Sequence, residues 1–281
     1  MSTKKIDALI VTYNSEKYIG SLLRQLVKTG TIKEIYMLDN GSHDSTVEKA
    51  MTVKSKKINV ILGKKNIGFG NAMNVLFHKS KSEYKLLLNP DTKLRKNSLK
   101  KLLKCAMVNK ADIAGGPMVS MLGSQQISHT RIPNTMTVLF EFTNLKKLFP
   151  NNPWSKSFQY HDVQKDNTVR EVGTISGGYM LISDNVIKKL GGFDKHYFMY
   201  LEDIDLCNQA HKHGYKVLFC PHTQIIHIGG ASSSNKHKIH YKAWDRARIY
   251  YVRKNFTTPI SIILEAAIRI DIAITKHKRD E

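Results

Sequence analysis

Asn89-Pro90-Asp91 ends a run of leucines, so two oxygen-bearing side chains leave an expected strand one residue apart. Such oxygen ligands suit Mg²⁺ or Mn²⁺ held jointly with substrate phosphates, because these ions need few protein ligands. An ordinary Asn-Pro-Asp turn accounts for the same residues without a ligand. The tripeptide alone leaves both interpretations open.

Three carboxylates, Glu202, Asp203 and Asp205, open an expected helix. Acidic residues in a first turn are stabilised by the helix dipole, which is a purely structural explanation. Their mutual repulsion also raises carboxyl pKa values, which suits a general base. His227 follows Asp203 by 227−203 = 24 residues, and a lone histidine of this kind is more often structural.

Polar residues follow four successive strand-like segments at Thr12-Tyr13-Asn14, Asp39-Asn40, Asn66–Gly68 and Asn89–Asp91. Ligands of open α/β sheets bind at the carboxyl ends of the strands, so these residues are binding candidates. Asp39 could accept hydrogen bonds from a base or ribose, or belong to a plain turn. The glycines of 66–72 allow close backbone approach to a phosphate. They do not form a dinucleotide fingerprint, because Met73 occupies the third glycine position.

The elements that position these residues alternate along the first half of the chain. Strands are expected at 6–14, 34–40, 58–63 and 84–91, with helices between them, the first at 16–30 with Ser15 as its N-cap. This pattern predicts an α/β fold with a mostly parallel sheet flanked by helices. Further on, 120–170 is expected to be irregular, 173–182 a strand, 202–215 a helix, and 216–230 one or two strands.

Residues 258–281 are expected to form an amphipathic C-terminal helix, with Ser261, Glu265, Arg269 and Lys276 on or near one stripe. Such a helix packs on its own domain or on a second copy of the chain. The alternative is a helix lying on a membrane surface, which the terminal Lys-His-Lys-Arg favours.

The net charge of +21 (pI ≈ 9.8) predicts an anionic partner: nucleic acid, a membrane surface or a phosphorylated substrate. No nucleic-acid-binding motif accompanies the lysines, so no nucleic-acid partner is expected. The three cysteines show no CxxC spacing and predict a reducing compartment without a disulfide. The spacing of Cys207, His211, Cys220 and His222 matches no standard zinc site. Neither a signal peptide nor a spanning helix is expected.

Taken together, seven motifs resemble family 2 glycosyltransferases of the GT-A fold, and within them the rhamnosyltransferase and galactofuranosyltransferase-like subgroup. The resemblance covers residues 6 to about 234. It is carried by VTYN (11–14), LDNGSHDST (38–46), NIGFGNAMN (66–74), LLNPD (87–91), SGGYMLI (176–182), GGFDKHYFMYLEDIDLC (191–207) and H-IGGAS (227–232).

The resemblance implies a role for each matching residue. Nucleotide binding is implied for Thr12, Tyr13, Asn14, Asp39, Asn66, Gly68 and Asn89, with Asp39 on the pyrimidine base. Metal binding is implied for Asp91 and His227, with Asn89 standing where the family usually has the first aspartate of Asp-x-Asp. Catalysis is implied for Asp203 as the base, with Glu202 beside it, and donor or acceptor contact for Gly177, Gly178 and Asp205.

The implied reaction is inverting, Mn²⁺- or Mg²⁺-dependent transfer of a sugar from a nucleotide donor. The expected donor is dTDP-rhamnose, with UDP-sugars (galactose, galactofuranose, glucose or N-acetylglucosamine) as the alternative. The expected acceptor is a lipid-linked glycan at the anionic inner face of the cell membrane, where the chain is cytoplasmic and peripheral. Residues 1–235 would form the catalytic domain (1–115 nucleotide-binding, 116–235 acceptor-binding), and 236–281 a helical segment contacting a membrane or a second copy. The non-enzyme alternatives are an inactive scaffold and a nucleic-acid-binding protein.

Overall fold

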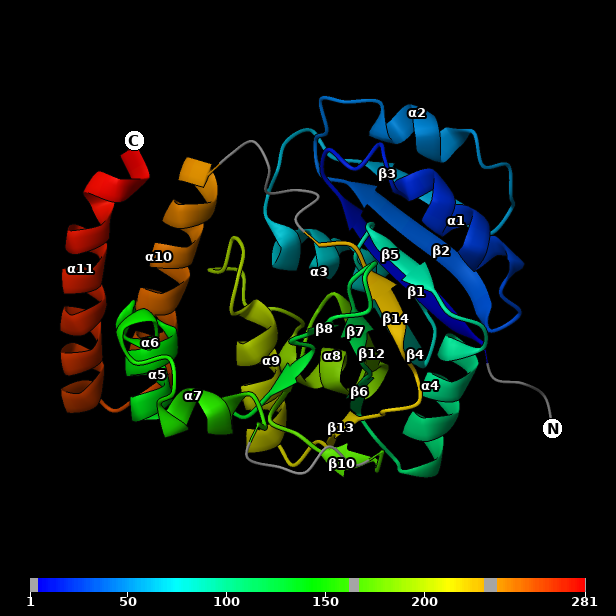
Figure 1. The fold of residues 1–281 in the computed structure, drawn as a ribbon. Helices are drawn as coiled ribbons and strands as arrows, with labels where there is room; N and C mark the ends of the chain where they lie inside the picture. Colours follow the sequence, from blue (N-terminus) through cyan, green and yellow to red (C-terminus); the bar gives the residue numbers. More distant parts are fainter. Residues whose placement is uncertain (1–4, 162–166, 230–236, 281) are drawn as a thin grey trace.

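The computed structural model describes residues 5–161, 167–229 and 237–280 as an α/β fold around an eight-stranded sheet (Figure 1). Its strands lie in the order β10 (Arg170–Glu171), β13 (Val217–Phe219), β6 (Ile113–Gly115), β12 (Tyr179–Ser183), β4 (Tyr84–Leu88), β1 (Ile6–Thr12), β2 (Ile32–Asp39) and β3 (Ile58–Leu62). β12 runs antiparallel to both neighbours and β10 antiparallel to β13, while the remaining pairs are parallel. The mostly parallel sheet predicted from the sequence is therefore confirmed.

Helices cover both faces of this sheet because alternate strand residues point to opposite sides. In β1, Ala8 and Ile10 belong to one core cluster, whereas Leu9 and Val11 belong to the other. The first cluster is covered by α1 (Ile19–Lys28), α2 (Thr46–Met51) and α4 (Ser98–Val108). The second is covered by α3 (Phe69–Lys79), α8 (Asp184–Leu190) and α9 (Glu202–Lys212).

A second, four-stranded sheet has the order β5 (Thr92–Leu94), β14 (Ile225–His227), β7 (Met118–Val119) and β8 (Gln125–Gln126). β14 pairs antiparallel with β5, so that His227 lies opposite Thr92. This register brings His227 next to Asp91, although 136 residues separate them in the sequence. A third sheet joins only β9 (His129–Thr130) and β11 (Thr174–Ile175).

Helices at the other end of the molecule form their own core. α5 (Thr135–Glu141), α6 (Leu145–Leu148) and α7 (Pro153–Phe158) lie beside α10 (His237–Asn255) and α11 (Thr258–Asp280) (Figure 1). Val138, Tyr251, Leu264 and Ile268 are fully buried together there. Arg248, 1% exposed, donates to Asp271 (2.6 Å) and so ties α10 to α11. No helix among the described residues combines the length and hydropathy needed to cross a membrane.

Three local predictions are wrong. The first helix begins at Ile19, because Ser15 instead begins a turn, its carbonyl accepting from the N–H groups of Tyr18 and Ile19. The segment expected to be irregular contains α5, α6 and α7. The single strand expected at 173–182 is divided into β11 and β12 by a turn at Gly177-Gly178.

The expectation that no disulfide forms is also wrong. Cys105 at the end of α4 is bonded to Cys220 just after β13, while Cys207 is free and buried. The two cysteines are 115 residues apart in the sequence, so their spacing could not predict the bond. Only the fold brings the end of α4 beside β13. The cysteine pattern consequently gives no support for a reducing compartment.

Candidate active site

Asp39, at the end of β2, joins the ends of two strands through its carboxylate. Its Oδ1 accepts from the hydroxyls of Thr12 (3.1 Å) and Ser42 (2.5 Å), and its Oδ2 accepts from the Ser42 backbone N–H (2.9 Å). The side chain is 4% exposed. Only the remaining lone pairs of this carboxylate are left for a nucleotide, so its contact with a base stays a prediction.

Tyr13 and Asn14 lie against the loop that follows β2. Asn14 has a left-handed backbone (φ 50°); its N–H donates to Ser42 Oγ (2.9 Å) and its Oδ1 accepts from the His43 N–H (2.9 Å). The Tyr13 ring meets the His43 ring edge-on at 6.5 Å. The first and second strand ends thus form one connected surface, as the predicted nucleotide site requires.

The third strand end is held to the second by amide side chains. Asn66 Oδ1 accepts from Asn40 Nδ2 (2.9 Å) and from the Gly68 N–H (2.9 Å). Gly68 has φ 88°, and a Cβ there would lie 2.1 Å from the Phe198 carbonyl oxygen. Only glycine fits, because both the backbone conformation and the close approach exclude a side chain. Asn66 and Gly68 are therefore brought to the same edge as Asp39.

Glu202 and Asp203 begin α9 and differ sharply in their surroundings. Asp203 is half-buried, its Oδ2 accepting from the Gly177 N–H (2.9 Å) and its Oδ1 from the Ile204 N–H (2.8 Å). Glu202 is 7% exposed, and its Oε2 has no hydrogen-bond partner. Burial, and then the charge of Asp203, raise the pKa of Glu202 to about 8. Burial also raises the pKa of Asp203 above its ordinary value, although its backbone N–H donors oppose that rise.

These pKa directions predict how Glu202 affects stability. Because the folded-state pKa lies above the ordinary 4.5, the folded protein binds more protons than the unfolded chain between about pH 4.5 and 8. Folding is therefore expected to lose stability as pH rises through this range, by at most about 5 kcal/mol. Glu202→Gln should remove that loss, which urea unfolding of both proteins at pH 5 and pH 9 would measure. If the free energies of unfolding of wild type and Glu202→Gln differed by the same amount at pH 5 and pH 9, the prediction would be contradicted.

Gly177 and Gly178 connect the acid pair to the Asn-Pro-Asp segment. A Cβ on Gly177 would lie 3.1 Å from the Phe69 ring, and one on Gly178 would lie 2.9 Å from Asn89 Nδ2. The Asn89 N–H donates to the Gly178 carbonyl oxygen (3.1 Å). The absence of side chains at this turn makes room for Asp203 beside Gly177 and for Asn89 beside Gly178.

Asp91 and His227 converge beside Asn89. His227 Nε2 lies 3.3 Å from Asp91 Oδ1 and 3.2 Å from Asn89 Nδ2. His227 Nδ1 is 2.7 Å from Gln126 Oε1, an acceptor, which favours the tautomer with its proton on Nδ1. In that tautomer Nε2 can accept from Asn89 Nδ2 or bind a metal ion. Asp91 Oδ2 accepts from the Gly229 N–H (3.1 Å). Gly230–Ser232, the end of the last motif, lie outside the described residues.

This donor set fits a hard divalent cation. One ion with bonds of about 2.0–2.2 Å would hold a carboxylate oxygen and an imidazole nitrogen at close to the observed separation. Within the described ranges no three His, Cys, Asp or Glu side chains are grouped closely enough to hold an ion alone. Such a site would need oxygen atoms from a bound phosphate to complete its coordination.

Asp205 lies apart from this arrangement. It is 2% exposed, its Oδ2 accepting from Lys254 Nζ (2.7 Å) and its Oδ1 from Asn255 Nδ2 (2.9 Å). Lys254 also donates to Asp194 (2.7 Å). The predicted contact of Asp205 with donor or acceptor stays untested, and its observed contacts anchor α10 to α9.

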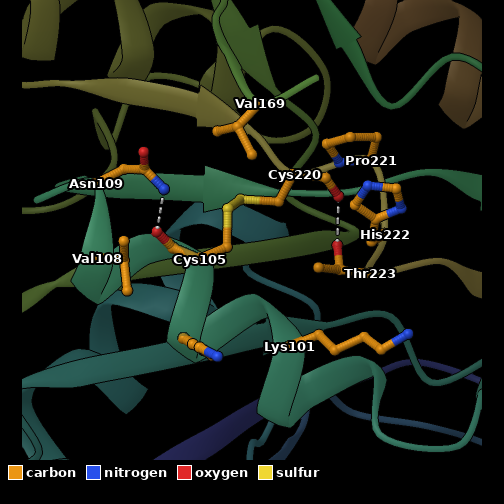
Figure 2. Close-up of a pocket in the computed structure, with 10 residues that line it drawn as sticks. Lys101, Cys105, Val108, Asn109, Val169, Cys220, Pro221, His222 and Thr223 are labelled. Atoms are coloured by element: carbon orange, nitrogen blue, oxygen red, sulfur yellow. Dashed lines mark hydrogen bonds between the residues drawn. A yellow bond between two sulfur atoms is a disulfide. The ribbon is translucent and has the colours of Figure 1, made fainter. Parts of the chain in front are cut away.

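Several contributing residues were not singled out from the sequence. One of them is Ser42, which follows Asp39 and Asn40 in the LDNGS motif; those two residues were already predicted as binding candidates. Gln126 lies in a segment with no local pattern, and only the pairing of β7 with β8 brings it to His227. A pocket of about 400 Å³ beside the disulfide, shown in Figure 2, contains none of the predicted site residues.

Known proteins resemble this chain along most of its length. The family described as glycosyl transferase family 2 matches residues 7–191. The N-acetylglucosaminyl-diphospho-decaprenol L-rhamnosyltransferase of Mycobacterium tuberculosis is 23% identical over 98% of this chain and 92% of its own. The rhamnosyltransferase WbbL of Escherichia coli is 27% identical over 78% of this chain and 81% of its own.

A solved structure shows the same fold. The mannosyltransferase PcManGT of Pyrobaculum calidifontis, in complex with GDP-mannose and Mn²⁺, superimposes with a TM-score of 0.58 at 10% identity, covering 97% of this chain and 75% of its own. The GT-A arrangement expected from the motifs is thereby confirmed. Because the family match spans well over half of the residues, this chain belongs to glycosyl transferase family 2.

Proposed function

We propose that this protein is an inverting, metal-dependent glycosyltransferase that moves rhamnose from dTDP-rhamnose onto a growing, lipid-linked cell-surface polysaccharide. The observation that supports this proposal most is that the Gly177-Gly178 turn contacts Asp203 at Gly177 and Asn89 at Gly178. Asn89 Nδ2 in turn lies 3.2 Å from Nε2 of His227, the partner of Asp91. A candidate base and a candidate cation-binding pair are thus held around one turn. The names of the mycobacterial and E. coli relatives support rhamnose as the sugar, and the first supports a polyprenyl-diphosphate acceptor.

In this mechanism Asp203 accepts the proton of an acceptor hydroxyl. The hydroxyl oxygen forms a bond to the anomeric carbon of the donor sugar, on the face opposite the nucleoside diphosphate. The bond from that carbon to the diphosphate oxygen breaks, its electron pair leaves with the diphosphate, and the sugar configuration is inverted. Glu202, kept neutral by burial at pH 7, leaves Asp203 as the charged member of the pair.

Asp91 and His227 would hold the divalent cation, Mn²⁺ or Mg²⁺, with Asn89 beside them. When bound, the ion would neutralise the negative charge on the leaving diphosphate. Gln126 fixes the tautomer of His227, as partners of metal-binding histidines commonly do. Asn89 contributes no charge, so this site relies on one carboxylate where the family usually has two.

Under this proposal the two halves of the catalytic domain bind different substrates. Residues 1–115 would bind the nucleotide through Thr12, Tyr13, Asn14 and Asp39, and residues 116–235 the acceptor. We assign Asp205 a positioning role, because Lys254 and Asn255 occupy its oxygens. The net charge of +21 favours peripheral attachment to an anionic membrane on its cytoplasmic side, where each nearby Lys or Arg contributes about 1 kcal/mol.

The test is donor consumption with and without Mn²⁺, using a short-chain polyprenyl-diphosphate N-acetylglucosamine as acceptor. The donors compared are dTDP-rhamnose, UDP-galactose, UDP-galactofuranose, UDP-glucose and UDP-N-acetylglucosamine. We expect metal-dependent transfer from dTDP-rhamnose, with an inverted anomeric centre in the NMR spectrum of the product. Turnover of a UDP-sugar but not of dTDP-rhamnose would show that the donor is that UDP-sugar. Nucleotide binding without any turnover would favour the inactive scaffold.

A further inference from the structure

α11 has two apolar faces, and the structure buries only one of them. Leu264 and Ile268 are fully buried against α10 and α5. Four other isoleucines of the same helix are 61–70% exposed: Ile262, Ile263, Ile270 and Ile274. At 100° per residue they occupy a sector of about 120°, on the opposite side of the helix from Leu264. Figure 1 shows α11 as the outermost helix, with α10 between it and the main sheet.

This outer face of α11, defined by those four isoleucines, is uninterrupted by charge. Ala266 and Ala273 lie within the same sector and are exposed. Among residues 258–275, the nearest charged side chains are Glu265 and Arg269, which lie outside the sector along one of its edges and pair with each other (2.7 Å). Contiguous exposed apolar surface of this kind marks an interaction site rather than scattered surface residues.

A second apolar patch lies on the neighbouring helices. Leu148 and Phe149, at the end of α6, are 72% and 57% exposed, and Trp154 on α7 is 37% exposed. The Trp154 ring stacks on Phe140 of α5 at 4.9 Å. α5 packs against α6, α7 and α11, so both patches belong to the same group of helices.

Exposed lysines lie beside the second patch. Residues 142–161 contain three lysines and no acidic residue, and Lys147 and Lys156 are exposed. On α10, Lys242 and Arg246 are exposed, whereas Arg248, Arg253 and Lys254 are paired with carboxylates. Apolar side chains flanked by Trp and by lysines form the pattern of a surface that dips into an anionic lipid interface. The width of the outer α11 face argues against a two-helix coiled coil, whose seam is a narrower stripe.

We propose that the outer face of α11, together with Leu148, Phe149 and Trp154, is the surface on which this protein lies on an anionic bilayer. This inference rests on the proposed function, in which the acceptor is anchored in lipid. Lys254 and Asn255 of α10 bond Asp205, two residues from Asp203, so the lipid-bound helices hold the helix of the base directly. The bilayer surface and the reacting groups are therefore connected through one set of packed helices.

The test is flotation with vesicles of phosphatidylcholine and phosphatidylglycerol (3:1) at low salt. We compare wild type, the double variant Ile263→Ser/Ile270→Ser, and Leu122→Ser, a matched control at a residue that is 97% exposed on the β7–β8 turn. The double variant should lose at least tenfold in vesicle partitioning and the control less than twofold. Lys147→Gln/Lys156→Gln should weaken binding to these vesicles and make it less sensitive to salt.

Two results would overturn the inference: unchanged flotation of the double variant, or a wild-type dimer in sedimentation equilibrium that this variant abolishes while vesicle binding persists. Circular dichroism of each variant would establish that it is folded. Transfer to a water-soluble acceptor separates the two proposals, because the double variant should retain it. Wild type that binds vesicles but consumes no donor would contradict the proposed function alone, and activity without vesicle binding would contradict this inference alone.

Discussion

Asp203→Asn is expected to reduce sugar transfer by about 10²–10⁴-fold while leaving donor binding within a few-fold of wild type. The asparagine oxygen can still accept from the Gly177 N–H, so the turn that positions the donor side should persist. What is lost is the negative charge that takes the acceptor proton. Single-turnover transfer measures the loss, and isothermal titration with the nucleoside diphosphate measures the retained binding.

The neighbouring carboxyl provides the discriminating comparison. Glu202 is mostly protonated at pH 7, because burial raises its pKa to about 8, and a protonated carboxyl cannot serve as the base. Glu202→Gln should therefore cost far less activity than Asp203→Asn. Glu171→Gln, at an exposed carboxylate on β10, is the control for removing a negative charge elsewhere. A larger loss from Glu202→Gln than from Asp203→Asn would transfer the role of base to Glu202.

The raised pKa of Asp203 also gives the direction of the pH profile. The base must be ionised, so transfer should fall as pH decreases through that raised pKa, at a higher pH than for an ordinary aspartate. Activity in Asp203→Asn should be small and should lack this acid limb. An unchanged acid limb in the variant would show that another group limits the rate.

The sequence predicted the sheet and the strand-end residues because both depend on local patterns. The apolar, β-branched run from Ile6 to Val11 predicts a buried strand directly, and a polar residue after such a strand must lie at its carboxyl edge. The contacts of Asp39 and Asn66 follow from that placement. Motif order along the chain then sufficed to recognise the family.

The remaining features depend on tertiary pairing, which local patterns do not encode. The contact of His227 with Asp91 depends on the register in which β14 pairs with β5. The contact of Gln126 with His227 depends on the pairing of β8, a strand of two residues, with β7. The apolar residues of α11 surround most of the helix, so the sequence could not tell which face packs on α10. The polar stripe expected on this helix does not lie on one exposed face: Ser261 is 8% exposed, whereas Arg269 is exposed to solvent. The side chain of Lys276, the last residue of that stripe, lies outside the described part of the chain.

The second large effect is expected at the Asp91–His227 pair. Asp91→Asn removes the carboxylate that the described residues place beside His227, so it should abolish the Mn²⁺ dependence of nucleoside diphosphate binding and reduce transfer by at least 100-fold. His227→Ala should raise the Mn²⁺ concentration for half-maximal binding by about 10–100-fold. Binding by titration calorimetry with and without Mn²⁺ measures both effects independently of turnover. His222→Ala, an exposed histidine on the same β13–β14 segment, should change neither quantity.

Two further variants make the assignment specific, because they alter the site without removing a ligand. Gln126→Leu leaves His227 in place but removes the acceptor at Nδ1, so Mn²⁺ affinity should fall by about 10–100-fold through loss of the correct tautomer. Asn89→Asp adds a second carboxylate beside His227 Nε2 and should lower the Mn²⁺ requirement. If Asp91→Asn kept a normal Mn²⁺ requirement, or Asn89→Asp raised it, the cation would have to be bound elsewhere. The opposite responses of residues 89 and 91 would instead place it between Asp91 and His227.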